Sequence, residues 1–180
     1  MDTRSAIIFP RALGALALLH VGLLAHIAEA SPVTSTTLAF ATSRMAFVYP
    51  VMGPRMSSDF GVRKHPLKKV RRHHDGIDLA APVGAPIRAI ADGQVMYADP
   101  HGGYGKYIVI RHTNGFTSHY GHCDKMEVVP GASVVAGQII GTVGSSGIST
   151  GPHLHFEIRR NGDAQDPEKY LPGLADQAAG

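Results

Sequence analysis

The stretch Gly151-Pro152-His153-Leu154-His155-Phe156-Glu157-Ile158-Arg159, near the C-terminus, decides the fold and chemistry expected of this chain. Polar and apolar side chains alternate through it without a break, which predicts a β-strand. His153, His155 and Glu157 fall on one face and the apolar residues on the other. Same-face neighbours lie roughly 7 Å apart, so the two imidazoles are placed to act on either side of one small group, such as a metal ion. A solvated face of a half-exposed strand gives the same pattern, so other segments must decide.

Short strand-like runs separated by glycine make up most of the chain from residue 82 onward. They span residues 85–90, 94–98, 106–112, 116–120, 134–135 and 138–143. Asp92-Gly93 and Asn114-Gly115 each separate two of these runs, and such dipeptides are hairpin signals. No convincing helix pattern lies between the runs. The sequence therefore predicts an all-β fold, an antiparallel sandwich or barrel-like domain with long loops.

The first 30 residues have the order of a secretory signal peptide. Two arginines precede an apolar run at residues 12–28, and Ala28-Glu29-Ala30 is a small-residue cleavage site, so we expect cleavage after Ala30. An uncleaved membrane anchor is the alternative, although the run is short for a spanning helix and contains two histidines. We therefore expect a periplasmic or secreted product without stable membrane insertion after cleavage.

One globular domain is expected beyond the signal peptide. Residues 31–56, rich in Ser, Thr and Pro, are expected to form a linker or a loosely packed first strand, residues 57–171 the domain, and residues 172–180 a flexible tail. The formal net charge of +3 could favour an anionic polymer such as cell wall, but it is too mild to indicate nucleic acid. The sequence gives no signal for the oligomeric state.

A second dense group of polar residues spans residues 71–78 and reads Arg-Arg-His-His-Asp-Gly-Ile-Asp. In an extended chain the Cα atoms of His74 and Asp78 would lie on the order of 13 Å apart, so they need a bend to share an ion. Gly76 permits that bend at low steric cost. With one histidine of the C-terminal strand, these residues would form a His, Asp and His set that suits zinc and leaves a fourth position for water.

These segments resemble the lysostaphin-type zinc endopeptidases, which cut the peptides of peptidoglycan. The shared elements are His-x-x-x-Asp at residues 74–78, Tyr-x-His at residues 120–122 and His-x-His at residues 153–155. Flanking runs at residues 60–66 and 147–152 are also similar, and the likeness extends from about residue 57 to residue 171. Three ordered motifs with flanks are specific, whereas any one of them alone would be weak.

The resemblance implies a secreted zinc metalloendopeptidase that hydrolyses peptide bonds in bacterial peptidoglycan, in the stem or the cross-bridge. It implies that His74, Asp78 and His155 bind one Zn²⁺ per chain at a cleft, and that His122 and His153 are catalytic residues beside the zinc-bound water. Two positions depart from the family pattern: Cys123 stands where an apolar residue is usual, and Ser146 where Thr is common.

The single cysteine, Cys123, cannot form a disulfide within the chain, so the core or a metal must stabilise an exported product. We expect it to be a small buried hydrophobe, with a soft competing metal ligand as the alternative. His119 alternates with Tyr120 and is expected to point away from the side of His122. The basic run from Arg63 to Arg72 either binds anionic wall polymer or forms a solvated loop.

Two other functions remain open. A non-catalytic wall-binding or hydrolase-activating module of the same fold would need no working site, but every ligand residue of the motifs is present. A biotinyl-like or lipoyl-like carrier is suggested by the rhythm of residues 128–138, but no lysine lies at a tight turn there. The sequence contains no His-Glu-x-x-His, the signature of another zinc hydrolase mechanism, and no phosphate-binding loop.

Overall fold

The computed structural model describes residues 46–53, 55–64, 71–171 and 173, which all fall within one compact unit, residues 41–180. The expected signal peptide, most of the expected linker and nearly all of the expected tail lie outside these residues. In the described part no helix reaches the length and apolarity that crossing a membrane requires.

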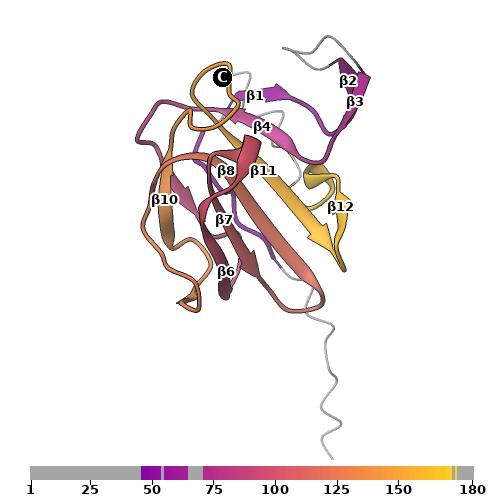
Figure 1. The fold of residues 1–180 in the computed structure, drawn as a ribbon. Helices are drawn as coiled ribbons and strands as arrows, with labels where there is room; N and C mark the ends of the chain where they lie inside the picture. Colours follow the sequence, from indigo (N-terminus) through magenta and orange to yellow (C-terminus); the bar gives the residue numbers. More distant parts are fainter. Residues whose placement is uncertain (1–45, 54, 65–70, 172, 174–180) are drawn as a thin grey trace, which may run out of the picture. The chain divides into compact units, whose positions relative to one another are not determined.

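Strands dominate the described part of the chain, which confirms the all-β prediction (Figure 1). The elements in chain order are β1 (Arg55–Ser58), β2 (Gly61–Lys64), β3 (Arg71–His74), β4 (Ile77–Ala80), β5 (Pro86–Arg88), β6 (Gly93–Pro100), the 3₁₀ helix η1 (Gly102–Tyr104), β7 (Lys106–Arg111), β8 (Phe116–Met126), β9 (Ser133–Val134), β10 (Ile139–Val143), β11 (His153–Arg160), β12 (Asp163–Gln165) and the 3₁₀ helix η2 (Pro167–Lys169).

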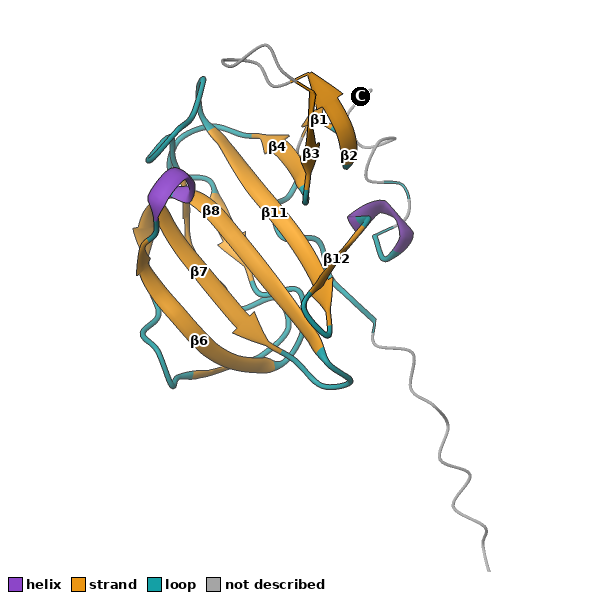
Figure 2. Ribbon diagram, turned by 45° about the vertical axis from the view of Figure 1, so that its right-hand side comes forward, coloured by secondary structure: helices purple, strands orange, loops and turns teal. Residues whose placement is uncertain are grey.

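One antiparallel sheet holds ten of these strands in the order β1-β4-β11-β8-β7-β6-β9, with β10, β5 and β12 branching from it. The long strands β6, β7, β8 and β11 lie side by side in Figure 2. Strand β10 pairs with both β8 and β5, so these strands add Ile87 and Ile140 to the same core as Phe156 of β11. Strands β2 and β3 form a separate hairpin.

The two predicted hairpins have different outcomes. Asn114 and Gly115, with φ of 56° and 75°, join β7 to β8 as predicted, because this turn needs left-handed backbone. The hairpin predicted across Asp92-Gly93 is wrong: β5 pairs with β10, and β6 pairs with β7 and β9. Gly93 serves a close approach instead, since a Cβ there would lie 2.4 Å from the carbonyl oxygen of Arg111.

The described part of the expected linker packs on the domain. Val51 is 1% exposed and belongs to the core cluster, and the Val48 amide donates to the Ile90 carbonyl at 2.8 Å. The ring of Phe47 meets the edges of Phe116 and Tyr170. Residues 46–53 therefore pack against the core and do not form a free linker.

Strand β11 is central to the sheet and shows the predicted alternation. Its apolar side chains Leu154, Phe156 and Ile158 are fully buried in the core. Along its two edges, β11 pairs with β4 and β8, so that His155 lies opposite Asp78 on one side and Gly121 on the other. The three segments that carry the sequence motifs are thus neighbours in one sheet.

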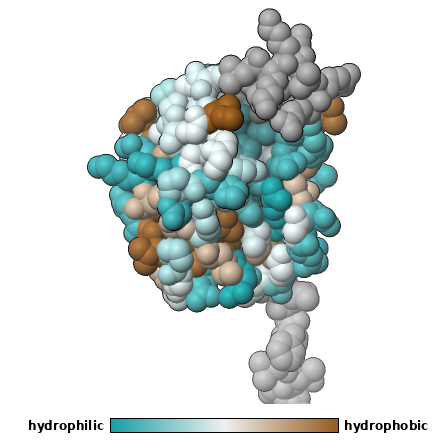
Figure 3. All heavy atoms as spheres, viewed as in Figure 1, coloured by the Kyte–Doolittle hydropathy of each residue, from teal (hydrophilic) through white to brown (hydrophobic). Residues whose placement is uncertain are grey.

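The surface is mostly hydrophilic or neutral on the face drawn in Figure 3, with apolar side chains in separate small patches. Large exposed apolar side chains include Met52, Val62, Val129 and Val135.

Candidate metal centre

The turn between β3 and β4 brings His74 and Asp78 together. Nε2 of His74 lies 3.2 Å from Oδ1 of Asp78, so the chain makes the bend that a shared ion requires. Gly76 in this turn rests directly on β11, where a Cβ would lie 2.2 Å from the carbonyl oxygen of Phe156. Only glycine lets the turn approach β11 this closely.

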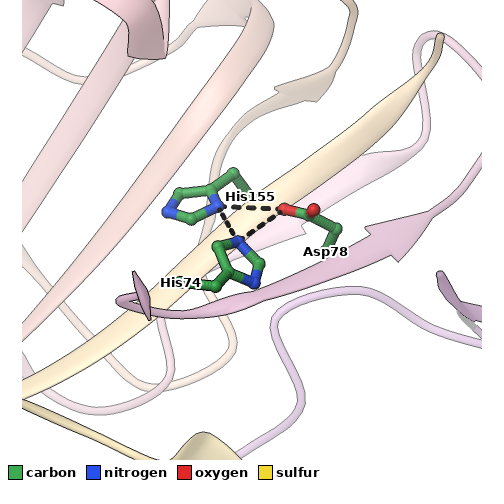
Figure 4. A group of neighbouring side chains, drawn as sticks. All are labelled: His74, Asp78 and His155. Carbon is green, nitrogen blue, oxygen red and sulfur yellow. Dashed lines mark hydrogen bonds and ion pairs between the residues drawn. The ribbon is translucent and has the colours of Figure 1, made fainter. Parts of the chain in front are cut away.

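Three donor atoms converge where this turn meets β11 (Figure 4). Nδ1 of His155 lies 3.1 Å from Nε2 of His74 and 2.9 Å from Oδ1 of Asp78. In the described part of the chain, these three residues are the one group of His, Cys, Asp and Glu side chains whose ligand atoms lie within 4.8 Å of one another. Tetrahedral zinc with Zn–N bonds of about 2.0–2.1 Å separates its ligands by about 3.3 Å, close to the sides of this triangle.

Outer hydrogen bonds aim both imidazoles at the same point. Nδ1 of His74 lies 2.8 Å from the carbonyl oxygen of Asp59, which can only accept, so His74 carries its proton there and presents a lone pair at Nε2. Nε2 of His155 lies 2.9 Å from Oε1 of Glu157, which holds the proton on that nitrogen and presents the lone pair at Nδ1. Two lone pairs and a carboxylate oxygen face one another, an arrangement that suits a cation.

Charge coupling supports the same conclusion. Burial favours the neutral form of Asp78, but the contacts of its carboxylate with His155 and His74 outweigh burial and hold the pKa of Asp78 well below its usual range. Burial likewise lowers the pKa of His155, but Asp78 and Glu157 outweigh it and raise that pKa to about 9. In the metal-free protein a proton on Nδ1 of His155 therefore competes with a metal ion for the same lone pair.

His122 reaches this centre through an irregularity in β8. Residues Lys106 and Ile108 of β7 pair with Cys123 and Tyr120, so β8 carries one extra residue there, a β-bulge. His122 itself has φ of 59°, a left-handed conformation that is rare outside glycine. Its ring centroid consequently lies 4.6 Å from that of His153 and 6.1 Å from that of His155.

The free nitrogens of His122 and His153 are also set by backbone carbonyls. Nδ1 of His122 donates to the carbonyl oxygen of Ser146 at 2.7 Å, and Nδ1 of His153 donates to that of Gly151 at 2.8 Å. Each ring therefore keeps Nε2 available, and Nε2 of His153 lies 3.7 Å from Oδ1 of Asp78. Burial lowers the pKa of His122 to about 4, so its imidazole is neutral at neutral pH.

The structure brings all five sequence-predicted site residues together, and it adds two. The first is Glu157, which is fully buried and hydrogen-bonds His155. Its position on the same strand face as His153 and His155 could have identified it from the sequence. Ser146 anchors His122 by its carbonyl, while its hydroxyl accepts from the Lys106 amide and donates to the Cys123 carbonyl. These backbone contacts leave no pattern in the sequence from which to predict them.

Three other expectations have clear outcomes. Cys123 is fully buried in the core cluster and lies outside the donor group, as expected for a small hydrophobe. The expectation that His119 points away from the side of His122 is wrong, because His119 pairs with Glu157 on the face of His155, and the bulge turns His122 toward that face. Arg63, Lys64, Arg71 and Arg72 lie in the β2–β3 hairpin, and residues 65–70 are outside the described residues.

Comparisons with known proteins identify metallopeptidases as relatives of this chain. Residues 72–167 match the family described as Peptidase family M23, which confirms the resemblance expected from the motifs. DD-carboxypeptidase/endopeptidase Mpg of Neisseria meningitidis is 47% identical over 120 residues, which cover 67% of this chain and 28% of the relative. Peptidoglycan DD-endopeptidase ShyC of Vibrio cholerae is 42% identical over 114 residues, which cover 63% of this chain and 26% of the relative.

Solved structures are similar as well. A zinc-containing peptidase from Vibrio cholerae has a TM-score of 0.63 and 40% identity, over 67% of this chain and 39% of that one. The matched residues cover about a quarter of the length of each of the two curated relatives, Mpg and ShyC. Since the family match covers more than half of the chain and includes every residue of the centre, the chain belongs to peptidase family M23.

Proposed function

We propose that this chain is a zinc metalloendopeptidase that hydrolyses peptide bonds in bacterial peptidoglycan, in a stem or a cross-bridge, outside the cytoplasm. The observation that carries the proposal is the convergence of three ligand atoms from His74, Asp78 and His155, all within 4.8 Å of one another. Relatives named as a DD-carboxypeptidase/endopeptidase and a peptidoglycan DD-endopeptidase support the substrate class. Because peptidoglycan lies outside the cytoplasm, the proposal includes export of the chain and cleavage of its signal peptide after Ala30.

The donor set fits zinc better than calcium or magnesium, because two of its three atoms are imidazole nitrogens. His74 and His155 would each supply a nitrogen, and Asp78 an oxygen. Bound zinc would supply Lewis-acid polarisation of a carbonyl and lower the pKa of water toward about 7.

His122 and His153 would move the protons of the reaction. Each has its Nδ1 proton committed to a backbone carbonyl, so each Nε2 can accept a proton and later donate it. Peptide hydrolysis needs one proton taken from water and one delivered to the leaving amine. Two facing imidazoles with ring centroids 4.6 Å apart can share these tasks, or one can hydrogen-bond the developing oxyanion.

The alternative is a non-catalytic wall-binding or hydrolase-activating module of the same fold. The conformation of His122 argues against it, because a non-glycine φ of 59° costs free energy and wall binding does not require it. Zinc content after mild dialysis separates the two functions: the enzyme retains about one zinc per chain, and a module without a working site retains none.

The decisive experiment is digestion of purified sacculi of different cross-bridge chemistry by the zinc-loaded protein, with mass spectrometry of the released ends. We expect new amino and carboxyl termini at one type of peptide bond, and their release should be about 10²- to 10⁴-fold slower with His153→Gln. Zinc-loaded protein that releases no ends from any sacculus would contradict the proposal. For export, a mature N-terminus within a few residues of Ser31 is expected in protein recovered from the periplasm or medium.

A further inference from the structure

Glu157 is a fully buried acid beside the centre, and the proposed reaction does not use it. Its oxygens accept from three side chains: Oε1 from the Tyr104 hydroxyl at 2.8 Å and from Nε2 of His155 at 2.9 Å, and Oε2 from Nε of Arg159 at 2.7 Å. A charge at this depth is costly unless hydrogen bonds satisfy it. Two of these donors, His155 and Arg159, lie on β11 itself, and Tyr104 lies at the end of η1.

The contacts continue from Arg159 to the turn that carries the other two ligands. A terminal nitrogen of Arg159 lies 2.7 Å from Oε2 of Glu157 and 3.6 Å from Oδ2 of Asp75. Asp75 directly follows His74 and precedes Gly76 in the turn between β3 and β4. One acidic and basic chain, Glu157–Arg159–Asp75, therefore connects the strand of His155 with the turn of His74 and Asp78.

A role in general stability is a weaker explanation for this chain. Buried ion pairs are often replaced by apolar residues without loss of stability, and the other face of the same strand packs as a wholly apolar core. The bond from Nε2 of His155 to Glu157, by contrast, decides which imidazole nitrogen faces the centre. Partners of this kind orient metal-binding histidines and fix their tautomer.

We infer that Glu157 is a positioning residue: it holds the Nε2 proton of His155 so that Nδ1 faces the metal, and with Arg159 and Asp75 it sets the spacing of the three ligands. The inference rests on the proposed zinc site. It predicts that the network affects metal affinity itself, before any peptide is bound.

The test is the zinc dissociation constant from competition with a chromophoric chelator, measured on wild type, Glu157→Gln and Arg159→Gln. Replacing a partner of this kind typically weakens metal binding about 10- to 100-fold, which we expect for Glu157→Gln. Arg159→Gln should weaken it in the same direction, because Glu157 loses its charged anchor. The matched control is Arg160→Gln, which removes the same charge from the next residue, an exposed arginine over the Phe116 ring.

A second readout is the imidazole ¹H–¹⁵N spectrum of the zinc-loaded protein. Wild type should show a slowly exchanging Nε2 proton for His155, and Glu157→Gln should lose or shift that signal. If Glu157→Gln fails to fold, Arg159→Gln and Tyr104→Phe still test the network, since each removes one anchor and keeps the carboxylate. Zinc affinities of the folded variants within twofold of Arg160→Gln would overturn the inference. Wild type that binds no zinc would instead contradict the proposed function.

Discussion

Nε2 of His74 and Nδ1 of His155 lie 3.1 Å apart, although 81 residues separate them in the chain. Outer bonds to Asp59 and Glu157 turn these two nitrogens toward each other, so a proton holds them together in the metal-free protein and a metal ion can replace it. Zinc should therefore stabilise the fold. We expect the thermal midpoint to fall in EDTA and to recover with zinc, because free zinc at 1,000 times its dissociation constant adds about 4 kcal/mol to the unfolding free energy. A midpoint that does not change with saturating zinc would contradict this.

Gly76→Ala should damage both the fold and the centre. The added Cβ would lie 2.2 Å from the Phe156 carbonyl oxygen, so the turn or β11 has to move. Overpacking of this kind costs about 1–3 kcal/mol, and the shift would also separate His74 from His155. Gly151→Ala is the control, because a Cβ there meets nothing within 4 Å, and it should cost less than about 0.5 kcal/mol. Urea unfolding and zinc content measure both effects; equal values for the two variants would refute the packing argument.

Stability should fall in mild acid through buried histidines outside the centre. Nδ1 of His112 donates to the Asp92 carbonyl at 2.8 Å in a part-buried contact, and Nε2 bonds the buried Ser118 hydroxyl at 2.7 Å. Burial lowers the pKa of His112, so the unfolded chain, with a pKa of about 6.5, binds the proton first as the pH falls. The contribution is constant above about pH 6.5 and is lost below it, by up to about 1.4 kcal/mol per pH unit for one group.

The measurement is the unfolding free energy of the metal-free protein between pH 6.5 and pH 5. In that window His112→Gln should show a shallower slope than wild type. His101→Gln, which changes an exposed histidine, should keep the wild-type slope. Parallel slopes for wild type and His112→Gln would show that this histidine does not cause the acid sensitivity.

Cys123 should be inert in the folded protein. Its side chain is fully buried, and burial raises the pKa of its thiol to about 12, so little thiolate forms at pH 8. A chromogenic disulfide reagent should label it only on the timescale of unfolding, with or without zinc. Rapid labelling that zinc suppresses would instead show that Cys123 is a ligand.

The sequence predicted the parts of this fold that depend on simple periodicity. Alternation along residues 153–159 predicted the face shared by His153 and His155, and Asn114-Gly115 predicted the β7–β8 hairpin. The hairpin predicted at Asp92-Gly93 is absent. Gly93 instead allows close contact with β7, and a local dipeptide carries no information about such a distant contact. The sequence left open whether residues 46–53 form a linker or a loosely packed first strand, because their packing on the core depends on contacts with distant residues.

The candidate site was predictable as a residue set but not as a geometry. Strict alternation places His122 on the core side of β8 with Tyr120, and only the bulge and the left-handed φ turn it toward His153. The bonds that fix the tautomers of His122, His153 and His74 run to the backbone carbonyls of Ser146, Gly151 and Asp59, and every residue type has such a carbonyl. Such contacts are set by the tertiary fold and leave no trace in side-chain identity.

The most direct test of the account is to measure zinc content and hydrolysis of sacculi together for His155→Gln, His153→Gln and His122→Gln. His155→Gln should lose both, because three protein ligands leave no spare. His153→Gln and His122→Gln should keep native zinc and lose about 10²- to 10⁴-fold in rate, the usual contribution of a positioned acid or base. If His153→Gln loses zinc as readily as His155→Gln, or retains full activity with zinc bound, the assignment of these residues is wrong.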